Sequence, residues 1–221
     1  MYVPPQFQPD RSTCLAFAAA RGFGTVCAWD GDKPVAAPVP FCMDFSSNGT
    51  PLLSFHVARG NPLTRLGNGR ARWLMAVNGD DAYVSPDWYA SPNQVPTWLY
   101  QSVHLTGAAA VMSDVELAAH LDGLSATFES CLPKPHWTLA KMPAGRREAM
   151  KQAIVGVMLR VDVVEGSFKL NQHKSDADHE AVAVALARQG DPAAQAIASQ
   201  MIALRPQLDY RLNAPVGEAA L

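Results

Sequence analysis

The segment His56-Val57-Ala58-Arg59-Gly60-Asn61-Pro62 has residue types suited to binding an anion. Asn61 is a favourable N-cap and Pro62 a favourable first helical residue, so the pattern predicts a helix that begins beside the basic groups of His56 and Arg59. Phosphate binds readily where a helix N-terminus and cationic side chains coincide. The same residues also fit a capped turn with a solvated arginine, so both interpretations stand at this point.

Two further segments combine polar and aromatic side chains. Residues 83–100 supply rings and hydroxyls, namely Tyr83, Ser85, Trp88, Tyr89, Thr97, Trp98 and Tyr100. Such a group can enclose a planar heterocycle, with Ser85 and Thr97 bonding its polar edge, and it fits an aromatic core or a dimer interface equally well. Residues 169–174 end a predicted strand with cations and amides, a pattern that usually lies on solvated surface.

Motifs of common enzyme and metal sites are missing from the chain. Gly67-Asn68-Gly69 is only a fragment of a dinucleotide loop, and Gly123-Leu124-Ser125 lacks the glycine of a nucleophile elbow. The six histidines lack metal-ligand spacing. The cysteines, Cys14, Cys27, Cys42 and Cys131, lack close pairs and are predicted to be buried thiols. No metal site is predicted.

Composition limits the location and the partners of the protein. Of its 221 residues 48% are hydrophobic, and the net charge is −2. No run approaches the roughly 20 apolar residues that span a bilayer, and no secretion signal is recognisable. The expectation is a cytoplasmic globular protein without membrane contact. Its cations are scattered, so direct DNA binding is doubtful.

Hydrophobic periodicity predicts an α+β, mainly β protein. Helices are expected at 11–20, 114–132, 145–152, 175–188 and 192–204, with capping boxes at Ser113/Glu116 and Ser175/Asp178. Strands are expected at 23–29, 35–43, 52–57, 72–77, 82–85, 98–112, 154–164 and 168–171, the last two paired across Glu165-Gly166. Strands that pair in sequence order favour an antiparallel barrel with peripheral helices. The expected domains are 1–174 and a helical C-terminal extension, 175–221, packed on it.

Several segments together resemble one family across nearly the whole chain. They are Met1-Tyr2-Val3-Pro4 with Phe7, His56 to Pro62, Ser85-Pro86 with Trp88-Tyr89, Val95 to Trp98 with Tyr100, Ile154-Val155-Gly156, and Lys169-Leu170 with Gln172. In this order they resemble the PaiB-like family of FMN-binding proteins, often labelled negative transcriptional regulators. The resemblance implies an FMN-binding split β-barrel, similar to pyridoxamine-phosphate oxidases, that forms a homodimer with two FMN sites between its subunits.

The resemblance also implies roles for individual residues. His56, Arg59 and Asn61 would hold the phosphate and ribityl end of FMN. Ser85, Trp88, Thr97 and Trp98 would approach the flavin. Lys169 and Gln172 would close the site, either from the same chain or from the partner chain. The sequence departs from the family pattern at Gln6, Leu99, Asn171 and His173. Of these, Leu99 and Asn171 remove or move polar groups near the expected pocket.

Three functions follow from these observations. The first is an FMN-binding regulator or sensor, in which cofactor occupancy or redox state biases a partner interaction. The second is a flavin-dependent oxidoreductase, in which FMN carries electrons and the protein orients a small substrate or metabolite. The third, haem binding through an exposed histidine, is a lesser alternative drawn from distant split-barrel relatives. No acid or base has a spacing that identifies a catalytic residue.

Overall fold

The computed structural model describes residues 1–210, and its contacts divide the chain into two compact units. The barrel unit comprises Asp10–Val77 and Val103–Glu165. The α4/α5 unit comprises Met1–Pro9, Asn78–Ser102 and, of the described residues, 166–210. The predicted domain boundary after residue 174 stays a prediction, and residues 211–221 of the expected extension lie outside the described residues. No helix of the described residues is long and apolar enough to cross a membrane.

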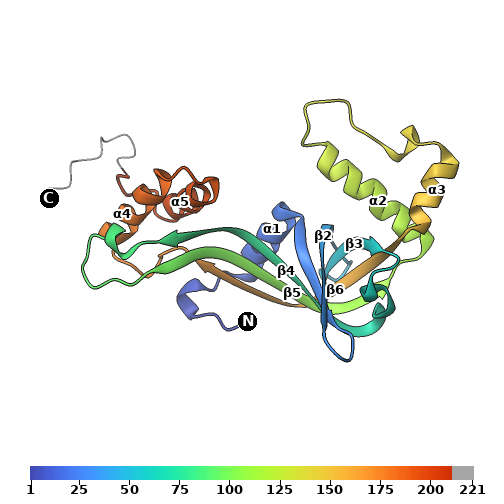
Figure 1. Cartoon of the computed structure of the whole chain (residues 1–221), viewed down its shortest axis with the longest axis horizontal. Helices are drawn as coiled ribbons and strands as arrows, with labels where there is room; N and C mark the ends of the chain where they lie inside the picture. Colours follow the sequence, from blue (N-terminus) through green and yellow to red (C-terminus); the bar gives the residue numbers. More distant parts are fainter. Residues whose placement is uncertain (211–221) are drawn as a thin grey trace. The chain divides into compact units, whose positions relative to one another are not determined.

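Six antiparallel strands form a closed barrel in the order β1-β2-β3-β6-β5-β4 (Figure 1). Their bounds are Phe23–Trp29 (β1), Pro34–Phe45 (β2), Pro51–Ala58 (β3), Asn68–Val84 (β4), Thr97–Val111 (β5) and Ile154–Lys169 (β6). Alternate residues of each strand face the same side, and one set is apolar and buried, as with Leu53, Phe55 and Val57 of β3. The register sets His56 of β3 opposite Gly156 of β6. The antiparallel barrel predicted from the sequence is confirmed.

The helices of the barrel unit lie close to the predicted ranges, although α2 ends at Glu129 instead of residue 132. Helix α1, Arg11–Arg21, begins after Asp10, whose carboxylate accepts the Thr13 N–H, and ends at Gly22 with a left-handed φ of 57°. Helix α2, Asp114–Glu129, has the predicted capping box of Ser113 and Glu116. Helix α3 spans Ala144–Gln152. Four 3-10 turns complete the described helices: η1 (Pro5–Phe7), η2 (Pro62–Arg65), η3 (Pro86–Trp88) and η4 (Leu139–Lys141).

Two predicted strand interruptions are wrong. Residues 72–77 and 82–84 lie in one strand, β4, and residues 154–164 and 168–169 lie in one strand, β6. The turn expected at Glu165-Gly166 does not form: Gly166 is buried within β6 and is not among the described glycines with positive φ. At Gly107 of β5 the structure explains the residue by close approach, since a Cβ there would lie 1.9 Å from the Arg160 carbonyl oxygen.

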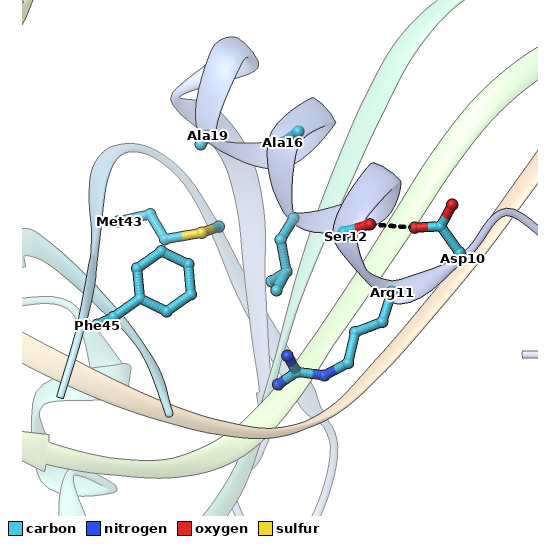
Figure 2. A pocket seen from close by; sticks show the side chains of 8 residues that line it. Asp10, Arg11, Ser12, Ala16, Ala19, Met43 and Phe45 are labelled. Atoms are coloured by element: carbon cyan, nitrogen blue, oxygen red, sulfur yellow. Dashed lines mark hydrogen bonds between the residues drawn. The ribbon is translucent and has the colours of Figure 1, made fainter. Parts of the chain in front are cut away.

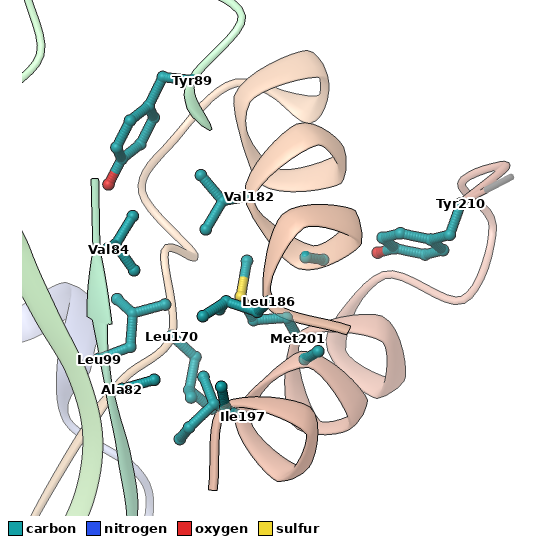
Figure 3. Packing of buried hydrophobic residues seen from close by; sticks show 13 residues of the cluster. Ala82, Val84, Tyr89, Leu99, Leu170, Val182, Leu186, Ile197, Met201 and Tyr210 are labelled. Carbon is teal, nitrogen blue, oxygen red and sulfur yellow. The ribbon is translucent and has the colours of Figure 1, made fainter. Parts of the chain in front are cut away.

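Helices α4, Asp176–Ala187, and α5, Pro192–Leu204, bury one hydrophobic cluster in the α4/α5 unit. In Figure 3, Val84, Leu99 and Leu170 face the side chains of both helices. Leu99 is fully buried there, which explains an apolar residue where the family tends to have asparagine.

Only one of the two hydrogen bonds of the capping box predicted at Ser175 and Asp178 forms. The Ser175 side chain does accept the Asp178 N–H, but the Asp178 carboxylate accepts the N–H and the hydroxyl of Ser91, both at 2.8 Å.

The prediction of buried thiols fails at one cysteine. Cys14 is buried and Cys27 and Cys42 are half-buried, and burial raises the pKa of each thiol. Cys131 is exposed because it follows the last turn of α2, beyond the part of that helix that packs on the barrel.

Candidate functional site

A chain of hydrogen bonds joins His56 to two residues that sequence reasoning did not select. His56 Nδ1 lies 3.0 Å from His120 Nε2, and His120 Nδ1 lies 3.1 Å from Ser54 Oγ. Strand β3 supplies Ser54 and His56, two residues apart and therefore on one face, and α2 supplies His120. The sequence feature that could have indicated His120 is its position three residues after Leu117, on the apolar face of α2.

Burial governs the ionisation of this pair. His120 is 6% exposed. Burial first, and the neighbouring His56 second, lower the pKa of His120 to about 4. Burial also lowers the pKa of His56. Both rings are therefore neutral near pH 7, and His56 Nε2 has no hydrogen-bond partner among residues 1–210.

Arg59 is held against the junction of α3 and β6. Its Nε donates to the Gln152 carbonyl at 2.5 Å, and its Nη2 donates to the Ile154 carbonyl at 3.0 Å. These bonds fix the guanidinium plane, while Nη1 has no partner within the described part of the chain. Arg59 therefore keeps donors with which it can bind an anion.

The helix expected after Asn61 is only one turn of 3-10 helix, η2. The Asn61 side chain accepts the Leu63 N–H at 3.0 Å, as an N-cap should, but the element ends after four residues. So short an element has little macrodipole, because the dipole sums over aligned peptide units. Phosphate binding at this place would depend on the side chains of His56 and Arg59.

Thr97 and Trp98, expected side by side at a flavin, face opposite sides of β5. Lys169 Nζ donates to Thr97 Oγ1 at 2.5 Å, on the face that includes the buried Leu99. Trp98 is 53% exposed on the other face, where its ring meets that of Tyr83 in an edge-to-face contact with 6.0 Å between centroids. The structure thus brings Thr97 and Lys169 together and gives Trp98 a separate aromatic partner.

The remaining expected residues bind their own loops. Ser85 caps η3 by accepting the Asp87 N–H at 3.3 Å, and Trp88 is half-buried against the hydrophobic cluster. Gln172 accepts the Leu170 N–H at 2.7 Å and donates to the Phe168 carbonyl at 2.5 Å. In this structure Ser85 and Gln172 therefore stabilise backbone turns, and Trp88 contributes to the hydrophobic cluster.

Asn171 has a conformation that few residues tolerate. Its φ is 58° and it is completely buried, which explains asparagine at this place because asparagine adopts the left-handed region more readily than most residues. Its Oδ1 accepts the Tyr89 hydroxyl at 3.4 Å, while Nδ2 has no partner among the described atoms. Burial raises the pKa of Tyr89.

A cavity of about 770 Å³ forms a mainly apolar groove between α1 and the end of β2. Figure 2 shows Met43 and Phe45 of β2 facing Ala16 and Ala19 of α1. Asp10 lies at one end, but hydrogen bonds from Ser12 and then Thr13 lower its pKa to about 2, so it is no proton donor near neutral pH. Among residues 1–210 no group of three or more acidic, histidine or cysteine side chains could hold a metal.

Known proteins match the chain over most of its length. A family model described as "Putative FMN-binding domain" matches residues 1–163. "Protease synthase and sporulation protein PAI 2" of Bacillus subtilis (strain 168) is 30% identical over 203 residues, covering 91% of this chain and 96% of the relative. The chain belongs to this PaiB-like FMN-binding family.

Solved structures agree with the family's split-barrel fold. An FAD and heme binding protein from Mycobacterium smegmatis is similar with a TM-score of 0.53, 20% identity and coverage of 73% of each chain. Conserved hypothetical protein Rv2991 from Mycobacterium tuberculosis has a TM-score of 0.55 and 10% identity, covering 79% of this chain and 94% of its own. The predicted fold and family are confirmed, and FMN is the cofactor of the family.

The residues present fit that cofactor within each unit. In the barrel unit, Arg59 Nη1 and His56 Nε2 have no partner among residues 1–210, and both are suited to a phosphate. The α4/α5 unit exposes the indole of Trp98, which is suited to a flavin ring. Bound FMN would supply electron transfer, while the protein would bind and orient it.

Proposed function

We propose that the protein is an FMN-binding homodimer that acts as a cytoplasmic regulator or sensor, in which the occupancy or redox state of FMN biases the interaction with a partner. Membership of the FMN-binding family supports the cofactor. The name of the Bacillus relative, which refers to protease synthesis and sporulation, supports a regulatory role.

The observation that carries the proposal is the exposed indole of Trp98. At 53% exposure, beside a 45% exposed Tyr83, it presents aromatic surface that the described chain leaves in water. Stacking against a planar ring system would remove that surface from water and add an aromatic contact. Thr97 and Lys169 lie on the opposite face of β5 from Trp98, so we propose that they bind the polar flavin edge, together with Gln172, from the partner chain. Ser85 and Trp88 are proposed to position their loop toward the flavin.

For the phosphate end we propose His56, Arg59 and Asn61. The fixed guanidinium of Arg59 retains Nη1, and His56 retains Nε2. Hydrogen bonds from a cation to phosphate are among the stronger ones in proteins. Asn61 holds the turn that follows them by capping η2.

Exposed apolar side chains of the barrel unit support the homodimer. Phe23 and Phe45 are each at least half exposed, and Phe45 lines the apolar groove of Figure 2. Large exposed apolar patches are typical of protein interfaces. An obligate dimer should bury more than about 2,000 Å² in total. Light scattering at micromolar concentration should give twice the chain mass, and a monomer would contradict the shared site.

Flavin titration of matched variants tests the cofactor site. Trp98→Ala should weaken FMN binding roughly 3- to 10-fold, the scale of one lost aromatic contact. Trp29→Ala is the control, because Trp29 is similarly exposed, at 61%, and lies outside the proposed flavin group. Equal losses in both variants would remove Trp98 from the site. The absorption spectrum of the purified protein should show the two visible bands of oxidised flavin, whereas a single intense Soret band would indicate haem.

The turnover rate of the holo-protein distinguishes a sensor from an oxidoreductase. Holo-protein supplied with NADH or NADPH and a panel of quinones should turn over far below the ~1 s⁻¹ at the low end of typical enzymes. In cells, replacing the wild type by Trp98→Ala at equal abundance should change transcript levels. Turnover in the ordinary enzyme range, with no transcript response, would favour the oxidoreductase.

A further inference from the structure

A second cavity of the barrel unit brings three basic side chains together away from the apolar groove. Its volume is about 300 Å³, and its walls come from α2, α3, the segment between them, and the neighbouring ends of β3 and β6. His56 of β3 lines it together with Arg147 and Lys151 of α3. No aspartate or glutamate is among its lining residues. The cavity is therefore suited to an anion.

The sequence of α3 accounts for this placement. Arg147 and Lys151 are four residues apart and so share one face of the helix. Arg147 is half-buried, and its guanidinium has no hydrogen bond or ion pair among the described residues. Lys151 contacts Glu148 at 3.4 Å, but the Glu148 side chain is 60% exposed, so this pair is weak. Two cations thus face the cavity with little compensation from the protein.

Most of the remaining wall is apolar. Leu121 and Leu124 of α2, Trp137 of the connecting segment and Met142 contribute to it. A ligand complementary to both kinds of wall has one anionic end and an apolar body. The volume lies at the lower end of the range for small-molecule sites, so the body is small.

We propose that this cavity binds a small organic carboxylate with an aromatic or branched aliphatic body. The planar fork of Arg147 matches a carboxylate in a bidentate arrangement, with Lys151 as a further donor. The apolar wall, including Trp137, covers the rest of the molecule. The inference rests on the proposed function only in that His56 is also one of the proposed FMN contacts, which would make the acid a substrate or effector of the flavin protein.

Calorimetric titration of the full-length protein, with and without FMN, tests the proposal. The probes are phenylacetate, 3-phenylpropanoate, 4-methylpentanoate, inorganic phosphate and 2-phenylethanol, the last being a neutral analogue of phenylacetate. At least one of the three acids should bind to both forms of the protein. Phosphate should bind at least tenfold more weakly than that acid. If phenylacetate binds, 2-phenylethanol should likewise bind at least tenfold more weakly than phenylacetate.

Adjacent arginines of α3 provide matched variants. Arg147→Gln should weaken binding of the acid at least tenfold, the scale of a charge-assisted hydrogen bond. Arg146→Gln should change it less than twofold, because Arg146 is exposed and does not line the cavity. Arg147→Lys, which keeps the charge but loses the fork, should give an intermediate affinity. Tryptophan fluorescence should change on binding in the wild type, and this change should disappear in Trp137→Phe.

Several results would overturn the proposal. Equal losses in Arg146→Gln and Arg147→Gln would show an effect of overall charge only. Displacement of the acid by phosphate or by FMN would assign the cavity to the cofactor. If the protein binds FMN but none of the three acids, this inference is refuted and the proposed function stands. If the protein binds an acid but never binds FMN, the proposed function is refuted and the acid site stands.

Discussion

His120 should make the stability of the protein fall between neutral and mildly acidic pH. Its pKa is about 4 in the folded state, against an ordinary value of about 6.5 for histidine. Between these pH values the unfolded chain binds a proton at this position and the folded chain does not. The contribution is therefore complete above about pH 6.5 and is lost as the pH falls toward 4. The perturbation we choose is His120→Gln, which removes the titration and keeps an amide able to bond Ser54 and His56.

The size of the effect follows from the change in pKa. At about 1.4 kcal/mol per pH unit, the interval from 6.5 to about 4 corresponds to about 3 kcal/mol. The ring is buried within the barrel unit, so solvent screens this effect only weakly. At pH 7 the variant should be somewhat less stable than the wild type, because its hydrogen bonds are poorer. Near pH 4.5 this difference should shrink or reverse.

Urea unfolding of flavin-free protein from pH 7 to pH 4.5 measures this difference. Wild type, His120→Gln and the control His136→Gln, an exposed histidine, are compared at one protein concentration, since any dimer makes stability depend on it. Titration of carboxylates cancels between variants. The difference in the free energy of unfolding between wild type and His120→Gln should change between pH 7 and pH 4.5. If it stays constant within about 0.5 kcal/mol, His120 is not a neutral buried histidine and the reasoning fails.

Four other expectations can be checked directly. Arg59→Ala should weaken FMN binding by roughly 1.5 to 3 kcal/mol and barely affect riboflavin, and equal losses for both in parallel titrations would show that Arg59 does not bind phosphate. Gly107→Ala should yield little folded protein, since its Cβ would overlap the Arg160 carbonyl, and normal circular dichroism and yield would argue against that approach. Asn171→Ala should lower the free energy of unfolding by roughly 1 to 3 kcal/mol through left-handed strain, whereas Asn171→Gly should be milder; urea midpoints in the opposite order would refute this. Duplex DNA should bind no better than about 10⁻⁴ to 10⁻⁶ M at physiological salt, and nanomolar binding to one promoter in the presence of competitor would restore a DNA-binding regulator.

Local signals predicted the helices well because their causes lie within a few residues. The capping box at Ser113 and the left-handed Gly22 are examples. The turn at Glu165-Gly166 was mispredicted because the ladder of the barrel keeps β6 extended despite the glycine. At Asp178 a contact with Ser91, 87 residues away, replaced the local bond that the pattern suggested.

The candidate site was predictable in part. His56, Arg59 and Asn61 stand in one segment, so their neighbourhood followed from the sequence alone. Strand periodicity could also have placed Thr97 and Trp98 on opposite faces. The pairing of His56 with His120 joins residues 64 positions apart, and a lone histidine on an apolar helix face carries no sign of its partner. The cavity beside α3 likewise depends on how α2 and α3 meet the barrel.

The hydrogen-bond chain from Ser54 through His120 to His56 also couples tautomers. A neutral imidazole has one N–H and one lone pair, so each ring passes on the direction of the bond it receives. When the Ser54 hydroxyl donates, His120 donates in turn and His56 presents an N–H at Nε2. When Ser54 accepts, every bond reverses and Nε2 presents a lone pair. A ligand that accepts a hydrogen bond from His56 thereby fixes the hydroxyl rotor of Ser54 two bonds away, and a ligand that donates one turns it round.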